Sequence, residues 1–112
     1  MDVLYYAPGA ASFLVHWLLI EVDAPYELRL VDTAARQQKS PGYLALNPNG
    51  VVPTLVIDGK PRYEAAALAM LLADRHPRAG LAPAFDAPQR ADYVQWMFNL
   101  ANMVQPLFRQ WW

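Results

Sequence analysis

The stretch YLALNPNGVVPTLVIDG, residues 43–59, decides the fold of this 112-residue chain. A short apolar run comes first and ends at NPNG, a dense turn signal. The apolar run 51–57 then predicts a strand with Pro53 near its start, and the following DG pair predicts a tight hairpin turn. We therefore expect a short helix, a turn and a β-hairpin whose return strand is residues 60–63.

The residues before this stretch predict a strand–helix–strand unit. Residues 3–6 are apolar and aromatic and are followed by a PG turn. Ser12 is then placed to cap a helix that runs to about Val22, and residues 26–31 alternate apolar and polar side chains as a second strand does. Because the connection is a tight crossover, we expect the two strands to pair in parallel.

The residues after the hairpin predict two helices and a linker. Residues 65–75 are rich in strong helix formers, and residues 79–88, with alanines, prolines and a glycine, are typical of a linker. Residues 89–112 carry apolar side chains at successive spacings of three or four, which predicts one long helix that Pro106 should kink and that ends in two exposed tryptophans, Trp111 and Trp112. Such an apolar helix needs partners, either in a longer chain or in another subunit.

The composition excludes several functions. Hydrophobic residues make up 55% of the chain, charged residues make up 17%, and the net charge of -1 comes without a basic cluster, so we expect no nucleic-acid binding. Cysteine is absent, which excludes disulfides, thiolate metal sites and a protein thiol nucleophile. The only histidines, His16 and His76, are expected to be structural or surface residues, and no metal site is expected. With no signal peptide and no apolar run of membrane-spanning length, we expect a soluble cytoplasmic protein.

Three stretches resemble the glutathione S-transferase family, in particular its bacterial members. YYAPGAAS (residues 5–12) resembles the family's YYSPGACS-type turn, and residues 43–59 resemble its YLAINPxGxVPxLxxDG signature. EAAALAMLLADRHP (residues 64–77) resembles its ExxAIxxYLADxxP helix. The similarity covers essentially all of residues 2–78, and residues 89–112 are similar to the first helix of the family's all-helical second domain.

The resemblance implies an α/β fold. We expect a thioredoxin-like β-α-β-α-β-β-α domain that binds glutathione at residues 2–78. A linker at residues 79–88 should follow, and residues 89–112 should form the first long helix of a truncated all-α domain.

The resemblance also implies a chemistry. Members of this family bind glutathione as co-substrate and stabilise its thiolate, the nucleophile that attacks an electrophilic small molecule. The turn carries Ala10 and Ala11 where relatives have serine or cysteine, so neither side chain can donate a hydrogen bond to the sulfur, although Ala11 is expected to contact glutathione. The remaining candidate catalytic residues are Ser12, Tyr6 and Tyr5. Ser12 can instead be an ordinary helix cap, and either tyrosine can be a core aromatic residue.

Four further residues are expected to bind glutathione. By resemblance Pro53 follows a cis peptide bond, and Val52 pairs through its main chain with the cysteinyl part of glutathione; otherwise a proline here marks an edge or a bulge. Glu64 is expected to hold the γ-glutamyl amine, although an acid is favoured at any helix start. Ala65 stands where relatives have serine or threonine, so one hydrogen bond to the γ-glutamyl carboxylate is missing.

Polar residues elsewhere complete the set of candidates. Lys39 and Arg36 lie where a basic residue could meet the glycyl carboxylate, or they are solvated loop charges. Asn102 and Gln105 could line the cleft from the long helix, although no motif requires it.

Two functions follow from these residues. The first is a glutathione transferase-like homodimer that activates glutathione for attack on a hydrophobic electrophile; the intact NPNGVVP stretch and Glu64 favour it. The alternative is a non-catalytic relative that serves binding or assembly, and the alanines at positions 10, 11 and 65 favour it. A thiol–disulfide oxidoreductase is excluded because the chain has no cysteine.

Overall fold

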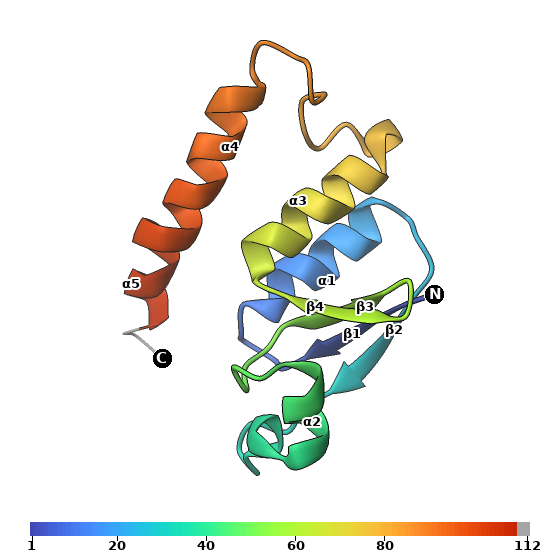
Figure 1. The fold of residues 1–112 in the computed structure, drawn as a ribbon, viewed down its shortest axis with the longest axis vertical. Helices are drawn as coiled ribbons and strands as arrows, with labels where there is room; N and C mark the ends of the chain where they lie inside the picture. Colours follow the sequence, from blue (N-terminus) through green and yellow to red (C-terminus); the bar gives the residue numbers. More distant parts are fainter. Residues whose placement is uncertain (110–112) are drawn as a thin grey trace.

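The computed structural model describes residues 1–109, and these contain one mixed four-stranded sheet (Figure 1). The strands are β1 (Asp2–Tyr6), β2 (Tyr26–Leu30), β3 (Thr54–Ile57) and β4 (Lys60–Tyr63), in the order β2-β1-β3-β4. β1 pairs with β2 in parallel, as predicted, and β3 pairs antiparallel with both β1 and β4. This is the expected α/β, thioredoxin-like arrangement of strands.

The DG hairpin and the glycine turn have the backbone that their residues favour. Asp58 and Gly59 have φ values of 53° and 76°, so both central residues of the β3–β4 turn are left-handed. Gly50, which ends the NPNG turn, has a φ of 62°. A Cβ on Gly50 would lie 2.9 Å from Lys39 Nζ, which can move, and 3.1 Å from the Gln38 carbonyl oxygen, so the left-handed backbone is the main reason for glycine there.

Three helices accompany the sheet: α1 (Ser12–Glu21), α2 (Pro41–Leu46) and α3 (Ala65–Arg75). Figure 1 shows α1 and α3 packed side by side on one face of the sheet and α2 on the other side. The core lies between the sheet and the α1–α3 pair, and its largest buried side chains are Leu4, Leu55, Val15, Leu19, Leu68 and Leu72. Burial of these aliphatic side chains fixes which face of the sheet the two helices cover.

The start of α1 differs from the sequence prediction. Ala11 is the N-cap, and Ser12 is already the first helical residue, so Ser12 does not cap the helix. Ser12 is only 1% exposed, and its hydroxyl is fully hydrogen-bonded inside the protein. Oγ accepts a hydrogen bond from the Ala7 N–H and donates one to the Ala7 carbonyl, both at 3.1 Å. Ser12 therefore closes the β1–α1 turn from inside.

The C-terminal segment is the long helix expected, interrupted by one irregular turn. It consists of α4 (Arg90–Asn99), a π-helical turn η3 (Leu100–Val104) and α5 (Gln105–Arg109). Pro106 has no N–H to donate to the carbonyl four residues earlier, and the irregular turn lies just before it. The rest of the predicted helix, including Trp111 and Trp112, lies outside the described residues.

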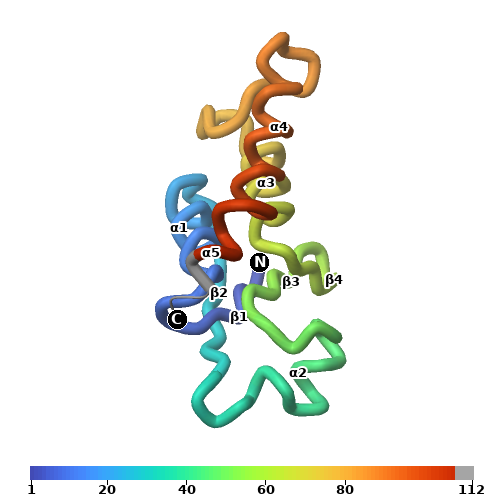
Figure 2. The backbone as a smooth tube through the Cα atoms, turned by 90° about the vertical axis from the view of Figure 1, so that its left-hand side faces the viewer, coloured from blue at the N-terminus to red at the C-terminus, as the bar shows by residue number. Residues whose placement is uncertain are grey.

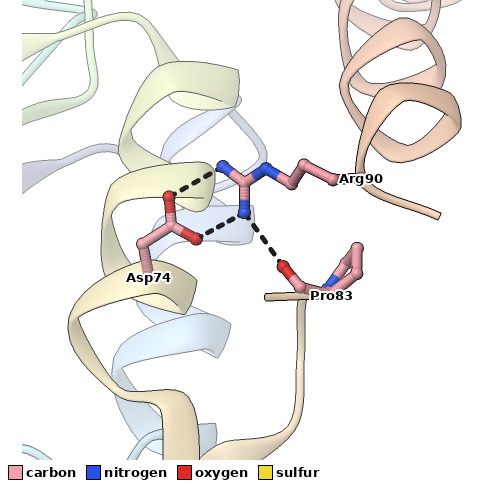
Figure 3. Close-up of polar contacts among 3 residues, drawn as sticks. All are labelled: Asp74, Pro83 and Arg90. Carbon is pink, nitrogen blue, oxygen red and sulfur yellow. Dashed lines mark hydrogen bonds and ion pairs between the residues drawn. The ribbon is translucent and has the colours of Figure 1, made fainter. Parts of the chain in front are cut away.

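An arginine clamp holds α4 to α3 (Figure 3). Arg90 donates two hydrogen bonds to the Asp74 carboxylate, at 2.9 and 3.0 Å, and one to the Pro83 carbonyl at 3.0 Å. The Arg90 side chain is only 15% exposed, and its hydrogen bonds lower the pKa of the Asp74 carboxyl. As a result, the α4–α5 segment runs alongside α3 and α1 (Figures 1 and 2). Across residues 1–109, no helix has the length and apolar character needed to cross a membrane.

Candidate functional site

A cavity of about 340 Å³ opens where four segments meet. These segments are the start of α1, the loop before β3, the β4–α3 junction and the η3–α5 segment. Its lining includes Ala11, Val52, Pro53, Glu64 and Ala65, which are five of the residues proposed from the sequence, and also Asn102 and Gln105. The fold therefore brings residues 11, 52–53, 64–65, 102 and 105 to one place.

A buried polar network fixes the loop that carries Val52. Tyr43 Oη donates to the Val51 carbonyl at 2.7 Å, so the Thr54 hydroxyl, also 2.7 Å away, must donate to Tyr43. Asn47 Nδ2 donates to the Val51 carbonyl at 3.0 Å and to Thr54 Oγ1 at 3.2 Å. Burial raises the pKa of the Tyr43 phenol. The network holds the main chain at Val51 in place.

The next peptide bond, Val52–Pro53, is cis, as predicted. Asn47 and Thr54 are both completely buried, and Tyr43 is 5% exposed. Hydrogen bonds in such a water-excluded place are stronger than at the surface and specify one geometry. This wall of the cavity is consequently built on a rigid support.

Glu64 has a backbone that side chains rarely adopt. Its φ is 78° and its ψ is 103°, and α3 begins at the next residue. The first hydrogen bond of α3 runs from the Leu68 N–H to the Glu64 carbonyl at 2.9 Å, so the N–H groups of residues 65–67 have no partner within the helix. Ala65 and Ala66 line the cavity, which places the positive end of α3 beside the Glu64 carboxylate. This wall therefore offers the Glu64 carboxylate to the amine of a ligand, and the N–H groups at the start of α3 to the carboxylate of a ligand.

The three hydroxyls expected to activate a thiol lie outside the cavity lining. Ser12 Oγ is bonded to Ala7, as described above. Tyr5 faces the α2 side of the sheet, where its hydroxyl accepts a hydrogen bond from Arg29 at 3.2 Å and its ring meets the Tyr43 ring edge-on at 5.9 Å. Tyr6 is half-buried against the core and tilts toward the His16 ring at 6.3 Å.

The two basic candidates also lie outside the lining. Lys39 packs its Nζ against Gly50, the residue just before the cavity-lining Val51. Arg36 is exposed, with a left-handed φ of 59°, and precedes the short 3-10 helix Gln37–Lys39. Of the two, Lys39 is nearer to the loop that forms the cavity.

Sequence reasoning missed six lining residues, namely Asn49, Val51, Tyr63, Ala66, Ala101 and Pro106. Asn49 lies in the NPNGVVP stretch and the other five adjoin a proposed residue, so the available signal was position beside these residues.

A second cavity, of about 530 Å³, lies beside the first between α1, α3 and α4. Its lining is almost entirely apolar and includes Leu14, Leu18, Ala69, Met97, Leu100 and Val104. Three residues, Ala66, Ala101 and Gln105, line both cavities. A polar pocket therefore adjoins an apolar one. Within residues 1–109, no cluster of three or more His, Asp or Glu side chains could hold a metal ion.

Comparison with known proteins agrees with this geometry. Residues 11–75 match the family model for the glutathione S-transferase N-terminal domain. The chain is 39% identical, over 95% of its length, to glutathione S-transferase GST-4.5 of Xanthomonas campestris, of which it covers 51%. It is 36% identical to glutathione S-transferase 1 of Schizosaccharomyces pombe, covering 87% of this chain and 44% of that protein.

Solved structures give the same result. A Sulfitobacter glutathione transferase homolog with bound glutathione superposes with a TM-score of 0.83 at 37% identity, over 91% of this chain and 49% of that chain. A Methylococcus capsulatus glutathione transferase gives 0.89 at 31% identity, over 100% of this chain and 56% of that chain. The chain belongs to the glutathione S-transferase family. It spans about half the length of the curated relatives that it matches.

Proposed function

We propose that the chain binds glutathione in the polar cavity and activates its thiol for attack on an electrophile. The observation that carries this proposal is the convergence of Ala11, Val52, Pro53, Glu64 and Ala65 on one cavity. The peptide's cysteinyl part lies along Val52, its γ-glutamyl amine meets the Glu64 carboxylate, and its γ-glutamyl carboxylate meets the N-terminus of α3. Lys39 is the nearer cation for the glycyl carboxylate.

The chemical requirement is ionisation of the bound thiol. A free thiol has a pKa near 8.5, and lowering it by about two units makes the sulfur mostly thiolate at neutral pH, a differential stabilisation of roughly 2.7 kcal/mol. The apolar cavity next to the polar one supports a hydrophobic electrophile as the second substrate.

Retention on immobilised glutathione, followed by conjugation of glutathione to a chlorinated nitroaromatic, tests this proposal. Glu64→Gln removes the charge that meets the amine and should weaken retention at least tenfold, because a hydrogen bond to a charged group contributes roughly 1.5–3 kcal/mol. Glu27→Gln on β2 removes an exposed carboxylate of the same kind away from the cavity and should change nothing. A wild-type chain that is not retained would contradict the proposal.

The alternative function is binding without catalysis, and one observation favours it. None of the three candidate hydroxyls, on Ser12, Tyr5 and Tyr6, lines the cavity, and Ala11 offers no side-chain donor. A chain that is retained on glutathione but leaves the thiol pKa at its solution value and gives no conjugate would support this alternative over the first.

We propose in addition that the chain forms a homodimer. The C-terminal segment exposes large apolar side chains, among them Trp96 at 59% and Phe98 at 57%. Burial of such apolar surface lowers the free energy by about 25 cal/mol per Å². A second subunit that covers this surface therefore stabilises the dimer. Sedimentation velocity should find a dimer that the pair of substitutions Trp96→Glu and Phe98→Glu dissociates; a wild-type monomer at micromolar concentration would refute this.

A further inference from the structure

On the wall where the sulfur is expected, the described residues give the polar cavity no side-chain hydrogen-bond donor. Ala11 forms this wall at the start of α1, and its methyl group cannot donate. The neighbouring hydroxyl of Ser12 already donates to the Ala7 carbonyl. Any side-chain donor to the sulfur must therefore come from another wall.

The opposite wall supplies side-chain amides. The η3–α5 segment contributes Ala101, Asn102, Gln105 and Pro106 to the lining. These positions are one, three and one residues apart, so they share one side of the helical segment. Asn102 and Gln105 each carry an NH₂ group with two donors, and neither amide titrates. They present neutral, permanently available donors to the cavity.

The shape of the segment directs these amides. The chain leaves α-helical geometry at Leu100 and returns to it at Gln105, so Asn102 lies within the π-turn and Gln105 directly follows it. Single π-turns inside helices are frequent at functional sites, because they re-aim side chains that a regular helix would place elsewhere. The Arg90–Asp74 clamp fixes the other end of the same segment against α3.

Gln105 occupies the place that the reaction requires. A sulfur that attacks an apolar electrophile must face both the peptide-binding cavity and the apolar cavity. The two cavities share only Ala66, Ala101 and Gln105 within the described residues, and Gln105 is the one with a polar side chain. Gln105 therefore lies at the boundary between the polar and the apolar cavity, where the thiolate must also lie.

We propose that the Gln105 side-chain amide donates a hydrogen bond to the glutathione sulfur and stabilises its thiolate, with Asn102 as a second donor. This inference rests on the proposed function of the cavity. The thiol releases its proton to water, the sulfur keeps the electron pair, and the amide N–H contacts the resulting anion. The donor that relatives place on the β1–α1 turn is thus supplied here by the facing helix.

Ultraviolet titration of the bound thiolate tests this assignment. Gln105→Ala should raise the pKa of bound glutathione by about one to two units, because a hydrogen bond to a charged group contributes roughly 1.5–3 kcal/mol and one pKa unit corresponds to about 1.4 kcal/mol. Gln105→Glu should raise it further, since a carboxylate only accepts hydrogen bonds and repels the thiolate. Asn102→Ala should give a smaller rise.

Two controls separate this effect from loss of structure. Asn99→Ala removes an exposed amide from the end of α4 that does not line the cavity, and it should leave the thiol pKa unchanged. S-methylglutathione has no ionisable thiol, so the Gln105 variants should bind it within about twofold of wild type. A variant that loses S-methylglutathione as well would show that Gln105 shapes the cavity rather than the sulfur, and would overturn the assignment.

The remaining outcomes distinguish this inference from the proposed function. If wild type binds both peptides and Gln105→Ala leaves the thiol pKa unchanged, the inference is overturned and the proposed function stands. If wild type binds neither peptide, the proposed function fails and the inference fails with it.

Discussion

Asn47→Ala is the substitution that most directly tests how the fold supports the cavity. Asn47 is completely buried, and its side chain makes three hydrogen bonds. Its Nδ2 donates to the Val51 carbonyl at 3.0 Å and to Thr54 Oγ1 at 3.2 Å, and its Oδ1 accepts from the Asn49 N–H at 3.0 Å. The first two join the NPNG turn to the segment that follows it, and the third lies within the turn.

The magnitude follows from what each partner retains after the change. The Val51 carbonyl still accepts from Tyr43, and the Asn49 N–H belongs to an exposed residue that water can reach. The Thr54 hydroxyl still donates to Tyr43, so none of the three partners is left buried and unpaired. The cost therefore stays near the net contribution of about 1 kcal/mol for each hydrogen bond. We expect the free energy of unfolding to fall by about 2–3 kcal/mol, a large part of the roughly 5–15 kcal/mol of a small domain.

Urea denaturation followed by circular dichroism measures this loss. With a slope of about 1–3 kcal/mol per molar urea, the midpoint should fall by about 0.7–3 M. Asn49→Ala removes an exposed amide two residues away and should cost no more than about 0.5 kcal/mol. If the two variants unfold at the same urea concentration, the buried network does not support the loop and the reasoning is wrong.

The loop carries Val51 and Val52 into the cavity, so Asn47→Ala should also weaken retention on glutathione. Glu64→Gly should raise the free energy of unfolding by about 1 kcal/mol. The reason is that relief of the strained backbone gains about 1–3 kcal/mol, whereas the entropy cost of glycine is about 0.5–1 kcal/mol. A urea midpoint below that of Glu64→Ala would contradict this prediction. Removing the clamp with Asp74→Asn should lower the melting temperature at neutral pH. Arg90 depresses the pKa of Asp74 in the folded state. The clamp's contribution to stability is therefore complete above the unfolded pKa of about 3.9 and is lost as the pH falls through the lower folded pKa. As a result, the melting temperatures of wild type and Asp74→Asn should converge in acid. A gap that stays constant with pH would refute this role.

Local signals in the sequence predicted most of the fold. The DG pair specified a left-handed two-residue turn, and the structure has positive φ at Asp58 and Gly59. The alternation of residues 26–31 predicted a strand because side chains of a strand point to opposite faces, and β2 spans Tyr26–Leu30. These predictions succeeded because short-range sterics and periodicity decide such features.

The site was predicted less completely, because it depends on contacts between distant segments. The sequence identified residues 11, 52–53 and 64–65 through resemblance, and all of them line one cavity. It could not show that Ser12 turns inward to Ala7, since a serine at a helix start has the same local signal whether it caps the helix or closes the turn behind it. It also could not show that Tyr5 faces α2, because alternation separates two neighbouring residues without saying which face holds the site.

By itself, then, the sequence determined the order of strands and helices, the turn geometries and the family. The tertiary structure alone decided which polar groups share the cavity. Ser12, Tyr5 and Tyr6 lie outside its lining, whereas Asn102 and Gln105, which are distant in sequence, lie in it. The physical reason is that propensity and periodicity act over a few residues, whereas the cavity is formed by packing α4–α5 beside α1 and α3, which no local pattern encodes.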